Sequence, residues 1–461
     1  MIHRFEQNGI YIILDVYSGA VHIADRLIYD LLGEIDSDSI KTGKIPESII
    51  SSLSGRFAAD EICEAFCEVC ELYSAGLLYS EDTYGDLGEY GGGEIPVKAL
   101  CLHVSHDCNM RCKYCFASTG DFGGERSLMN LETAKRAIDF VVKKSGKRRN
   151  IEIDFFGGEP LMAFDVVRGT VEYACAIEKE HNKNFRFTIT TNGLLLNAEN
   201  ILYINENMSN IVLSLDGRKE VNDRLRVLPN GSGTYDAIVE KFQKLIAGRG
   251  NKDYYLRGTF TGFNKDFSND VLHMAKIGFK NLSVEPVVCN LSEPYALHEE
   301  DIPSIFAEYD RLTDALVDMR KRGEGVTFFH FMVDLSQGPC VIKRVKGCGA
   351  GGEYLAVTPT GEIYPCHQFV GQQGYRMGNV FEGEINERIS KSFASVTLNS
   401  RAKCRNCWAK YYCSGGCSAA NYFQNRDILE PYALGCEMEK KRLECAIYMA
   451  SISKTTPYEV N

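Results

Sequence analysis

Three features are scarce or absent in this sequence, and each excludes a class of protein. No run of about 18 uncharged apolar residues occurs, so we expect neither a transmembrane helix nor a membrane partner. The apolar run at residues 10–14 is short and ends at Asp15, which argues against a signal peptide. Basic residues are in the minority, with 51 lysines and arginines against 62 acidic residues and a net charge of −11, so nucleic acid is not an expected partner.

Cysteine, in contrast, is abundant. The 461 residues include 18 cysteines, and without a secretion signal such a number indicates metal ligands in a reducing compartment rather than disulfides. We therefore expect a cytoplasmic protein. The apolar content of 44% and charged content of 25% are ordinary for a globular chain, and the length allows about two to four domains.

The most informative cysteines are Cys108, Cys112 and Cys115 in the segment Cys-Asn-Met-Arg-Cys-Lys-Tyr-Cys-Phe at residues 108–116. On a short loop after a strand-like run, this spacing lets three thiolates face one small volume. A structural zinc ion would be expected to take four protein ligands. An iron–sulfur cluster held by three thiolates leaves one iron open for a substrate or cofactor, so the segment predicts a catalytic cluster.

The same spacing occurs at Cys63, Cys67 and Cys70, so spacing alone decides nothing. On a helix over residues 58–75 these cysteines fall on one side together with Phe66, while the glutamates fall mostly off it. Free cysteine packs as a small hydrophobe, so we expect this copy to be the buried face of a helix.

Residues 2–95 are predicted to form a small separate domain, with an N-terminal cap on the larger domain as the alternative interpretation. Alternating residues 11–17 and 20–23, joined at Ser18-Gly19, suggest a hairpin, and helices are expected at 24–32 and 58–75. The glycine-rich residues 82–94 are interpreted as a linker.

From residue 96 to 295, strand-like and helix-like segments alternate. Six β/α units predict an α/β fold with a parallel sheet curved into a partial (β/α)6 TIM-like barrel, in which the ligand lies at the carboxyl ends of the strands. The predicted strands are residues 97–104, 151–156, 185–191, 211–215, 254–261 and 282–288, and the predicted helices are 131–144, 166–180, 235–247 and 269–276.

Short polar and glycine residues follow these strands. Paired glycines let a ligand approach the backbone closely, short polar side chains suit a ribose or carboxylate, and an arginine can pair with a carboxylate. Glu285, near the end of the sixth strand, is a candidate for a base. The other candidates, in strand order, are Gly157, Gly158, Glu159 and Pro160; Thr190 and Asn192; Ser214 and Asp216; and Arg257.

Residues 296–345 are expected to form a bridging helical region, in which His330 is a packed histidine rather than a ligand. Residues 346–461 carry a second group of cysteines whose number and spacing predict metal, with two zinc ribbons as the competing interpretation. Cys101, Cys175, Cys289 and Cys445 have no motif partner and are predicted to be core thiols. The second group consists of Cys348, Cys366, Cys404, Cys407, Cys413, Cys417 and Cys436.

Cys108, Cys112 and Cys115, with Tyr114 in the aromatic position, resemble the signature of the radical S-adenosylmethionine (SAM) family, and residues 157–160 resemble its methionine-binding motif. The resemblance implies a [4Fe-4S] cluster whose fourth iron binds SAM and cleaves it to a 5′-deoxyadenosyl radical. It also implies that Tyr114 contacts adenine and that the rest of SAM is held by Thr190, Asn192, Ser214, Asp216 and Arg257.

The second cysteine group resembles the SPASM extension of radical SAM enzymes in every spacing. This resemblance implies two auxiliary [4Fe-4S] clusters, three clusters in total. The first auxiliary cluster is one ligand short, and either Cys340 or a substrate thiolate is expected to complete it. Carried over by position, Cys348, Cys366 and Cys417 belong to the first auxiliary cluster, and Cys404, Cys407, Cys413 and Cys436 to the second.

The order of these regions resembles the maturases of ribosomally made peptides, whose winged-helix-like N-terminal domain binds a leader peptide as an added strand. Residues 8–22 and 347–359 resemble the maturases of cysteine-rich SCIFF peptides, which join a cysteine sulfur to a carbon of an acceptor residue. The implied partners are a precursor peptide and a one-electron donor such as a flavodoxin or ferredoxin. An anaerobic sulfatase-maturating enzyme and a non-enzymatic iron–sulfur or zinc scaffold are the alternatives.

Overall fold

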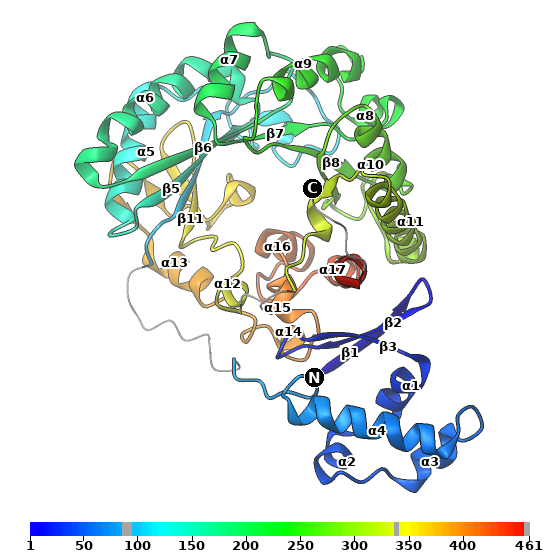
Figure 1. The fold of residues 1–461 in the computed structure, drawn as a ribbon. Coiled ribbons are helices and arrows are strands. Elements are labelled where there is room, and N and C mark those ends of the chain that lie inside the picture. The colour runs from blue at the N-terminus through cyan, green and yellow to red at the C-terminus, as the bar shows by residue number, and fades with distance from the viewer. Residues whose placement is uncertain (85–94, 336–340, 456–461) are drawn as a thin grey trace.

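The computed structural model describes residues 1–84, 95–335 and 341–455 (Figure 1). The glycines of the predicted linker, within residues 85–94, and Cys340 lie outside the described residues. Among the helices that are described, none is both long and apolar enough to cross a membrane.

An 11-stranded sheet forms the centre of the molecule, in the order β10-β9-β8-β7-β6-β5-β4-β11-β12-β13-β14. Strands β4 to β9 are parallel and consecutive, as the alternation of strands and helices predicts. Along β5 and β6, buried positions alternate with more exposed ones, because one face packs under helices. The strands are β4 (Ala99–Ser105), β5 (Asn150–Gly157), β6 (Asn184–Thr191), β7 (Asn210–Ser214), β8 (Tyr255–Phe260), β9 (Asn281–Pro286) and β10 (Thr327–Phe328).

Helices connect the parallel strands and cover the outer face of the curved sheet (Figure 1). Polar caps start several of them: the Asn130 side chain, for example, accepts the backbone N–H of Thr133 at the start of α5. The ranges of α5 and α9 match the prediction, whereas α7 and α8 were not predicted. The helices are α5 (Leu131–Lys144), α6 (Phe164–His181), α7 (Ala198–Asn207), α8 (Lys219–Leu225), α9 (Tyr235–Ala247), α10 (Phe267–Lys276) and α11 (Ile302–Lys321).

The C-terminal region extends the same sheet. Strand β11 (Tyr354–Val357) pairs in parallel with β4, and β12 (Glu362–Tyr364), β13 (Gly378–Asn379) and β14 (Glu384–Ile385) continue in antiparallel fashion. Helix α17 (Ala433–Thr455) packs along α11. The cysteine-rich segment therefore lies against the barrel. Its short helices are α12 (Val341–Lys346), α13 (Glu387–Ala394), α14 (Ala402–Arg405), α15 (Lys410–Cys413) and α16 (Ser418–Asn425).

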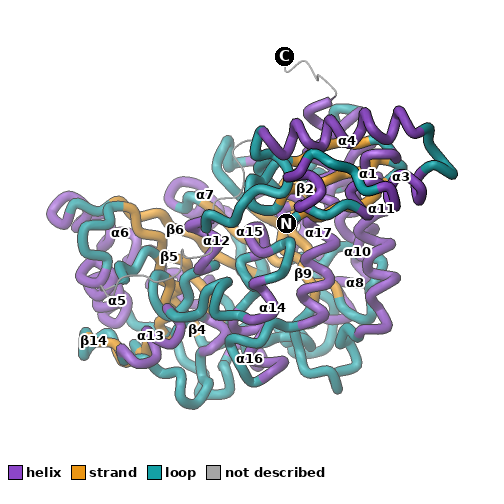
Figure 2. The backbone as a smooth tube through the Cα atoms, turned by 90° about the horizontal axis from the view of Figure 1, so that it is seen from below, coloured by secondary structure: helices purple, strands orange, loops and turns teal. Residues whose placement is uncertain are grey.

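A second, three-stranded sheet at the N-terminus is antiparallel and contains the predicted hairpin, with β1 added in front of it. Helix α1 packs on it, α3 and α4 pack against α1, and α2 packs against α4, so that the four helices form one lobe beside the sheet (Figures 1 and 2). The strands are β1 (Ile2–Gln7), β2 (Ile10–Asp15) and β3 (Val21–Ala24), and the helices are α1 (Arg26–Glu34), α2 (Ser37–Thr42), α3 (Glu47–Leu53) and α4 (Ala59–Ser74).

This N-terminal sheet is shared between two hydrophobic cores. Ile13 packs with the N-terminal helices, whereas Phe5, Ile12 and Leu14 belong to the core of the main body. The ring of His3 stacks on Trp408, with ring centroids 3.6 Å apart, and β1 contacts α17. The N-terminal region therefore has a core of its own and is also packed against the main body through its sheet.

The cysteines of α4 are not buried, so that prediction was wrong. The helix itself is present, but Cys63 and Cys67 are exposed and Cys70 is half-buried. The row that packs inward starts one residue earlier, at Ile62, and continues through Phe66 and Val69. Because branched aliphatic and aromatic side chains bury more apolar area than a thiol, they take the inner face.

The unpaired cysteines outside the motifs differ in burial. Cys101 and Cys445 are buried core thiols, as predicted, but Cys289 is half-buried and Cys175 is exposed. His330 is packed as expected: its Nε2 lies 3.2 Å from Ser283 Oγ, and its Nδ1 lies 3.0 Å from an Arg442 guanidinium nitrogen. Burial lowers the pKa of His330 to about 3.

Candidate active site

A cavity of about 230 Å³ lies at the carboxyl ends of the parallel strands. It is lined by the predicted residues Cys108, Cys112, Tyr114, Cys115, Gly157, Gly158, Glu159, Thr190, Asn192, Ser214, Arg257 and Glu285. Residues from six strand ends thus converge on one space, as expected for a parallel barrel.

The three-thiol loop (residues 108–115) is held to the barrel by its backbone. The N–H of Arg111 donates to the carbonyl of Val227 at 2.7 Å, and the N–H of Lys113 donates to that of Leu225 at 2.9 Å. The Cys108 sulfur accepts from the backbone N–H of Met110 at 3.4 Å. Such N–H donors stabilise a thiolate or a metal-bound sulfur, so the loop suits a cluster ligand.

The two glycines at the end of β5 are required by this loop. Gly157 has φ +124°, and a Cβ on Gly158 would overlap the carbonyl oxygen of Asp107. The N–H of Gly158 donates to Ser105 and that of Glu159 to Asp107, at 2.8 and 2.9 Å. The chain that leads into the loop passes close to the backbone here. This is a second physical reason for glycine, beside the predicted approach of a ligand.

Glu159 joins two strand ends beneath the cavity. Its carboxylate accepts the Thr191 hydroxyl at 2.7 Å and the backbone N–H of Asn192 at 2.8 Å, and the side chain is fully buried. Burial raises the pKa of Glu159 to about 7, although these hydrogen bonds oppose the rise. Pro160 begins a short turn behind it and does not line the cavity.

Tyr114 is fixed by a buried ion pair. Its hydroxyl donates to both carboxylate oxygens of Asp216, at 2.9 and 2.7 Å, and Arg226 pairs with the same carboxylate at 3.0 Å. Asp216 is fully buried and does not line the cavity, so the structure places it behind Tyr114 rather than against a ligand. Arg226 does line the cavity and was missed, because it follows α8 in no recognisable motif.

Charged and polar groups line the remaining walls. The Asn192 amide donates to Asn109 Oδ1 at 2.8 Å and approaches the Cys108 sulfur at 3.6 Å, which ties the third strand end to the three-thiol loop. Arg257 and Glu285 form an ion pair at 2.7 Å. Burial opposes the charge of Glu285, but the Arg257 guanidinium outweighs it and holds the pKa of Glu285 below its usual value.

The C-terminal cysteines fall into two groups in which neighbouring thiols add to the raised pKa of a buried cysteine. Burial raises the pKa of Cys366, and Cys417 and Cys348 add to the rise; these three cysteines are named the first thiol set. Cys404, Cys407, Cys413 and Cys436 are named the second thiol set. In it, burial is the largest cause of the raised pKa of Cys436 and of Cys413. Cys404 and Cys407 add to the rise at Cys436, and Cys436 adds to the rise at Cys413.

Backbone amides point at several of these sulfurs. Burial raises the pKa of Cys366 to about 12, while the N–H groups of Gln368 and Phe369 oppose the rise. Burial likewise raises the pKa of Cys417, against N–H groups at the start of α16. Cys101 and Cys289 receive no such backbone bonds. The amides therefore suit ligand sulfurs.

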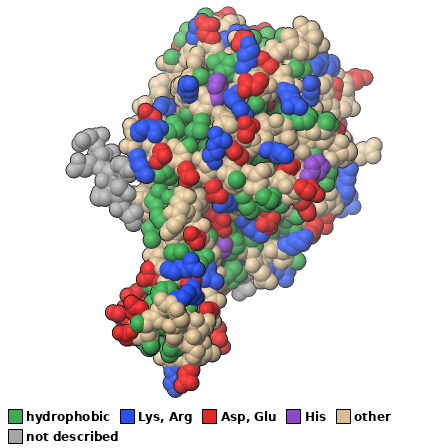
Figure 3. Space-filling model, turned by 90° about the vertical axis from the view of Figure 1, so that its right-hand side faces the viewer, with side chains coloured by type: hydrophobic (Ala, Val, Ile, Leu, Met, Phe, Trp, Pro, Cys, Tyr) green, Lys and Arg blue, Asp and Glu red, His purple; other side chains and the backbone are tan. Residues whose placement is uncertain are grey.

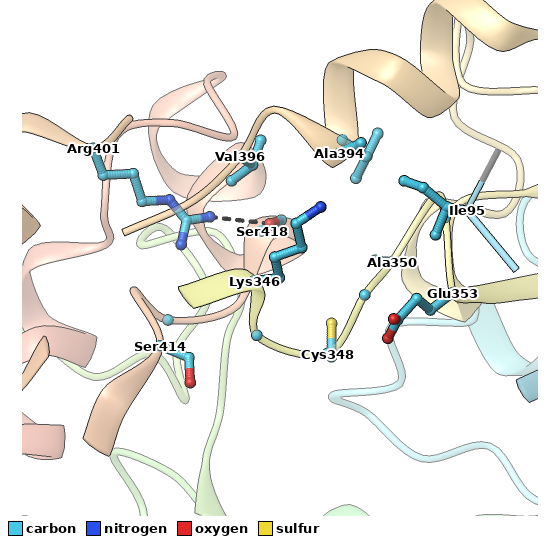
Figure 4. A pocket seen from close by; sticks show the side chains of 15 residues that line it. Ile95, Lys346, Cys348, Ala350, Glu353, Ala394, Val396, Arg401, Ser414 and Ser418 are labelled. Carbon is cyan, nitrogen blue, oxygen red and sulfur yellow. Dashed lines mark hydrogen bonds between the residues drawn. The ribbon is translucent and has the colours of Figure 1, made fainter. Parts of the chain in front are cut away.

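Cys348 lies at a small cavity of about 40 Å³ (Figure 4). Lys346 and Glu353 flank it, and across the cavity the Arg401 guanidinium donates to the Ser418 hydroxyl at 3.0 Å. In residues 1–84, 95–335 and 341–455, no three or more His, Cys, Asp or Glu side chains are placed to hold a single metal ion. Thiolates that share a cluster bind different irons of it.

His367 connects the two regions and was not predicted. It follows Cys366 directly, lines the main cavity, and packs on Phe156 with ring centroids 5.1 Å apart. Its Nδ1 lies 3.1 Å from the Tyr354 hydroxyl. The cavity is therefore bounded by the three-thiol loop on one side and by the segment next to the first thiol set on another.

A parallel β/α barrel whose first loop directs three thiols toward a cavity at the strand ends is the arrangement expected of an iron–sulfur enzyme. Sequence comparison gives the family: the radical SAM superfamily model matches residues 102–269, and the SPASM iron-sulfur cluster-binding domain model matches residues 348–408. The uncharacterized protein MJ0907 of Methanocaldococcus jannaschii is 35% identical over 319 residues, 68% of this chain and 96% of that protein. The chain belongs to the radical SAM superfamily and carries a SPASM domain.

Other relatives are more distant. The cysteine-type anaerobic sulfatase-maturating enzyme of Clostridium novyi is 25% identical over 341 residues, 69% of this chain and 87% of that enzyme. The structure of anSMEcpe with bound AdoMet has a TM-score of 0.64 at 21% identity, over 78% of this chain and 96% of that chain. Streptococcus suis SuiB bound to S-adenosylmethionine has a TM-score of 0.51 at 16% identity, over 94% and 98% of the chains. These two structures show the fold, which confirms the predicted α/β class, and the family implies [4Fe-4S] clusters and SAM as cofactors.

Proposed function

We propose that this chain is a peptide maturase that forms thioether cross-links, joining a cysteine sulfur to a carbon of an acceptor residue in a cysteine-rich precursor peptide. The observation that carries the proposal is the shared cavity. It lies against the three-thiol loop and also against His367, next to Cys366 of the first thiol set. A site that holds a sulfur beside the place where a C–H bond is broken suits the formation of a C–S bond.

Cys108, Cys112 and Cys115 are assigned to the cluster that binds SAM, and Tyr114, residues 157–160, Thr190, Asn192, Ser214 and Arg257 to SAM itself. Asp216 positions Tyr114. The first thiol set and the second thiol set are assigned to two auxiliary [4Fe-4S] clusters, with the last position of the first set left to a substrate thiolate or Cys340. Bound there, SAM would supply the acceptor of the abstracted hydrogen atom, and the auxiliary clusters would take up the surplus electron.

The chain's own residues then have defined tasks. Tyr114 and Asn192, held by Asp216 and by the three-thiol loop, orient the cofactor. Glu285, kept ionised beside Arg257, accepts the proton of the substrate thiol. We assign residues 1–95 to leader recognition, 96–295 to the radical SAM core, 296–345 to a bridge and 346–461 to the SPASM domain. A precursor peptide and a one-electron donor are the proposed partners.

Conversion of cysteine or serine to formylglycine is the second candidate. The relatives in Clostridium novyi and Clostridium perfringens are named cysteine-type anaerobic sulfatase-maturating enzymes, and another relative is named mycofactocin maturase. The N-terminal sheet favours the peptide maturase, because among the described residues β3 pairs on one side only and leaves an edge that sulfatase maturation does not require. Both candidates modify a peptide or protein.

Mass spectrometry separates the two. A cysteine-rich peptide incubated with protein, SAM and reductant should lose two hydrogens per cross-link and keep every sulfur, whereas cysteine-derived formylglycine loses the sulfur. In a Cys366→Ala variant, SAM cleavage should continue without cross-links, and Cys175→Ala, at an exposed thiol outside both sets, should be unaffected. A peptide that loses sulfur, or one that stays unchanged beside active SAM cleavage, would refute thioether formation.

A further inference from the structure

Arg401 is a buried arginine that borders both thiol sets. It is 2% exposed and directly precedes α14, where its carbonyl accepts the backbone N–H of Cys404 at 3.0 Å. Its side chain lines the small cavity at Cys348 (Figure 4). Its Nη1 donates at 2.6 Å to the carbonyl of Gly415, in the segment that joins the second thiol set to the first. One guanidinium therefore lies next to the ligand segments of both sets.

The groups that hold this guanidinium carry no formal charge. Besides the bond to Gly415, its Nη2 donates to the Ser418 hydroxyl and to the carbonyl of Ile428, both at 3.0 Å. The turn at Gly415 is shaped around the guanidinium, because a Cβ there would overlap Nη1 of Arg401. These contacts fix the position of the positive charge without neutralising it.

Arg401 lacks a counter-ion among the described residues. No carboxylate of residues 1–84, 95–335 and 341–455 pairs with it, and its buried Nε has no hydrogen-bond partner there. A buried charge without a counter-ion is costly, because burial removes its water. Burial accordingly lowers the pKa of Arg401, and cysteines of both sets oppose the fall, namely Cys404, Cys413, Cys417 and Cys348. Arginine keeps its charge at physiological pH, so the site is built for an anion on the cysteine side.

Other cations of the molecule are compensated. On the face shown in Figure 3, lysine and arginine side chains are interspersed with aspartate and glutamate side chains. The cations near the second thiol set have carboxylate partners as well: Lys440 pairs with Glu437 at 2.8 Å, and Arg442 pairs with Glu439. A paired carboxylate cancels part of the field of each cation, whereas the full charge of Arg401 acts on its surroundings.

We infer that Arg401 is the shared counter-ion of both auxiliary clusters, that its charge raises the reduction potential of each, and that its Nε–H donates to the cluster at the first thiol set. A cluster bound by thiolates is an anion and gains one negative charge on reduction, so a nearby cation or N–H donor favours the reduced form. The inference rests on the proposed assignment of the two thiol sets to clusters, and it adds the residue that tunes their potentials. Arg401 acts through the clusters and is therefore a positioning residue.

The proposed reaction gives this tuning a purpose. Thioether formation removes two hydrogens from the peptide. One leaves as a hydrogen atom to the 5′-deoxyadenosyl radical, and the other leaves as a proton to Glu285 and an electron to an auxiliary cluster. An oxidised one-electron carrier such as a flavodoxin then removes that electron. A raised reduction potential favours the uptake of the electron from the peptide.

Redox titration of the cluster-loaded, full-length protein, followed by electron paramagnetic resonance, tests this without turnover. Arg401→Gln removes the charge and should lower the reduction equilibrium constant of both auxiliary clusters by about tenfold, which is about 59 mV for one electron. The core cluster should keep its potential and serves as the internal reference. Arg401→Lys keeps the charge and should recover most of the loss. Unchanged potentials in Arg401→Gln, or a Lys variant as low as the Gln variant, would overturn the inference.

A second buried arginine provides the matched control. Arg249 is 4% exposed and donates to the carbonyls of Asp253 and Met208 on the barrel, away from both thiol sets. Arg249→Gln removes an equal charge from an equally buried position and should leave all three potentials unchanged. If it shifts the auxiliary potentials as Arg401→Gln does, the effect comes from the loss of a buried arginine in general and the inference is wrong.

Iron analysis covers the case in which Arg401→Gln cannot hold its auxiliary clusters. Loss of about eight of about twelve irons in this variant, with full loading of Arg401→Lys, would support the counter-ion role, because only the charge differs in sign of effect. Loss of the same iron from both variants would show a purely structural role and overturn the inference.

The outcome is separable from the proposed function. If the potentials shift as expected while a cysteine-rich peptide is never cross-linked, thioether formation fails and the role of Arg401 stands. Cross-linking by a protein whose potentials do not respond to Arg401→Gln has the opposite meaning. Wild-type protein with about four irons would refute the auxiliary clusters, and the inference with them.

Discussion

Two segments of this chain share one cysteine spacing and have opposite structures. In the three-thiol loop, Cys108, Cys112 and Cys115 face one cavity, and backbone bonds fix the loop to the barrel. On α4, Cys63 and Cys67 point into solvent from a regular helix. The difference shows that a ligand motif is defined by the backbone that presents it: a loop after a parallel strand can aim three thiols at one space, whereas a helix spreads them along its length.

Removing the thiols should produce the largest contrast between the two segments. A variant with Cys108, Cys112 and Cys115 changed to alanine should lose about four of about twelve irons and all 5′-deoxyadenosine formation, because the core cluster has no other ligands. The same triple change at Cys63, Cys67 and Cys70 should leave both unchanged. Iron and sulfide analysis, together with chromatography of the nucleoside, measures the result. Iron loss from the α4 variant would reverse the two assignments.

The second largest effect is expected from the glycine behind the loop. Gly158→Ala places a Cβ against the Asp107 carbonyl and should displace the three-thiol loop, at a cost of about 1–3 kcal/mol and a roughly tenfold or greater loss of SAM cleavage. Gly124→Ala is the matched control, since its nearest atom lies 3.6 Å from the added carbon. Equal activities of the two variants would show that the loop tolerates the added carbon.

A smaller, pH-dependent effect is expected at Glu159. Its pKa is raised by burial to about 7 from 4.5, so the protonated form is favoured in the folded state. Below about pH 4.5 the protonated Glu159 therefore makes its full contribution to the free energy of unfolding, which is at most about 3 kcal/mol. This contribution is lost as pH rises through 7. Glu159→Gln cannot titrate. Denaturant unfolding should show the wild-type protein losing stability relative to this variant between pH 5 and 8, and a constant difference would contradict the assignment.

The smallest effect is expected at the tyrosine of the loop. Tyr114→Phe keeps the ring in the cavity but removes the hydrogen bond to Asp216, so SAM affinity should fall by about 1 kcal/mol while the iron content stays constant. Tyr295→Phe removes a bond to the Lys113 carbonyl of the same loop from outside the cavity and should change SAM affinity less. Equilibrium dialysis with SAM provides the measurement; a larger loss in the Tyr295 variant would place the orienting contact elsewhere.

Much of the fold followed from local sequence patterns. Six strands and the helices α5 and α9 were predicted because alternating burial and helical periodicity are local properties. The lining of the cavity followed as well, since residues directly after parallel strands must meet at one edge. The place of Asp216 behind Tyr114 could not be predicted, because its partner Arg226 follows an unpredicted helix.

The failures share a cause. The face of α4 was assigned by grouping cysteines with Phe66, although Ile62 and Val69 provide larger apolar side chains one position away. His367 had no pattern of its own, and its place in the cavity depends on the way the C-terminal strands extend the barrel sheet. The burial or position of each of these residues depends on contacts between segments that are distant in sequence.

The N-terminal sheet has packed side chains on both faces, and this limits how the N-terminal region can be exchanged. A replacement region would have to present side chains equivalent to Phe5, Ile12 and Leu14 toward the main body, or leave that core open to water. The opposite face of the sheet packs only on the N-terminal helices, so its side chains need to fit those helices alone. The helix-facing side of this sheet is therefore easier to redesign than the whole N-terminal region is to exchange.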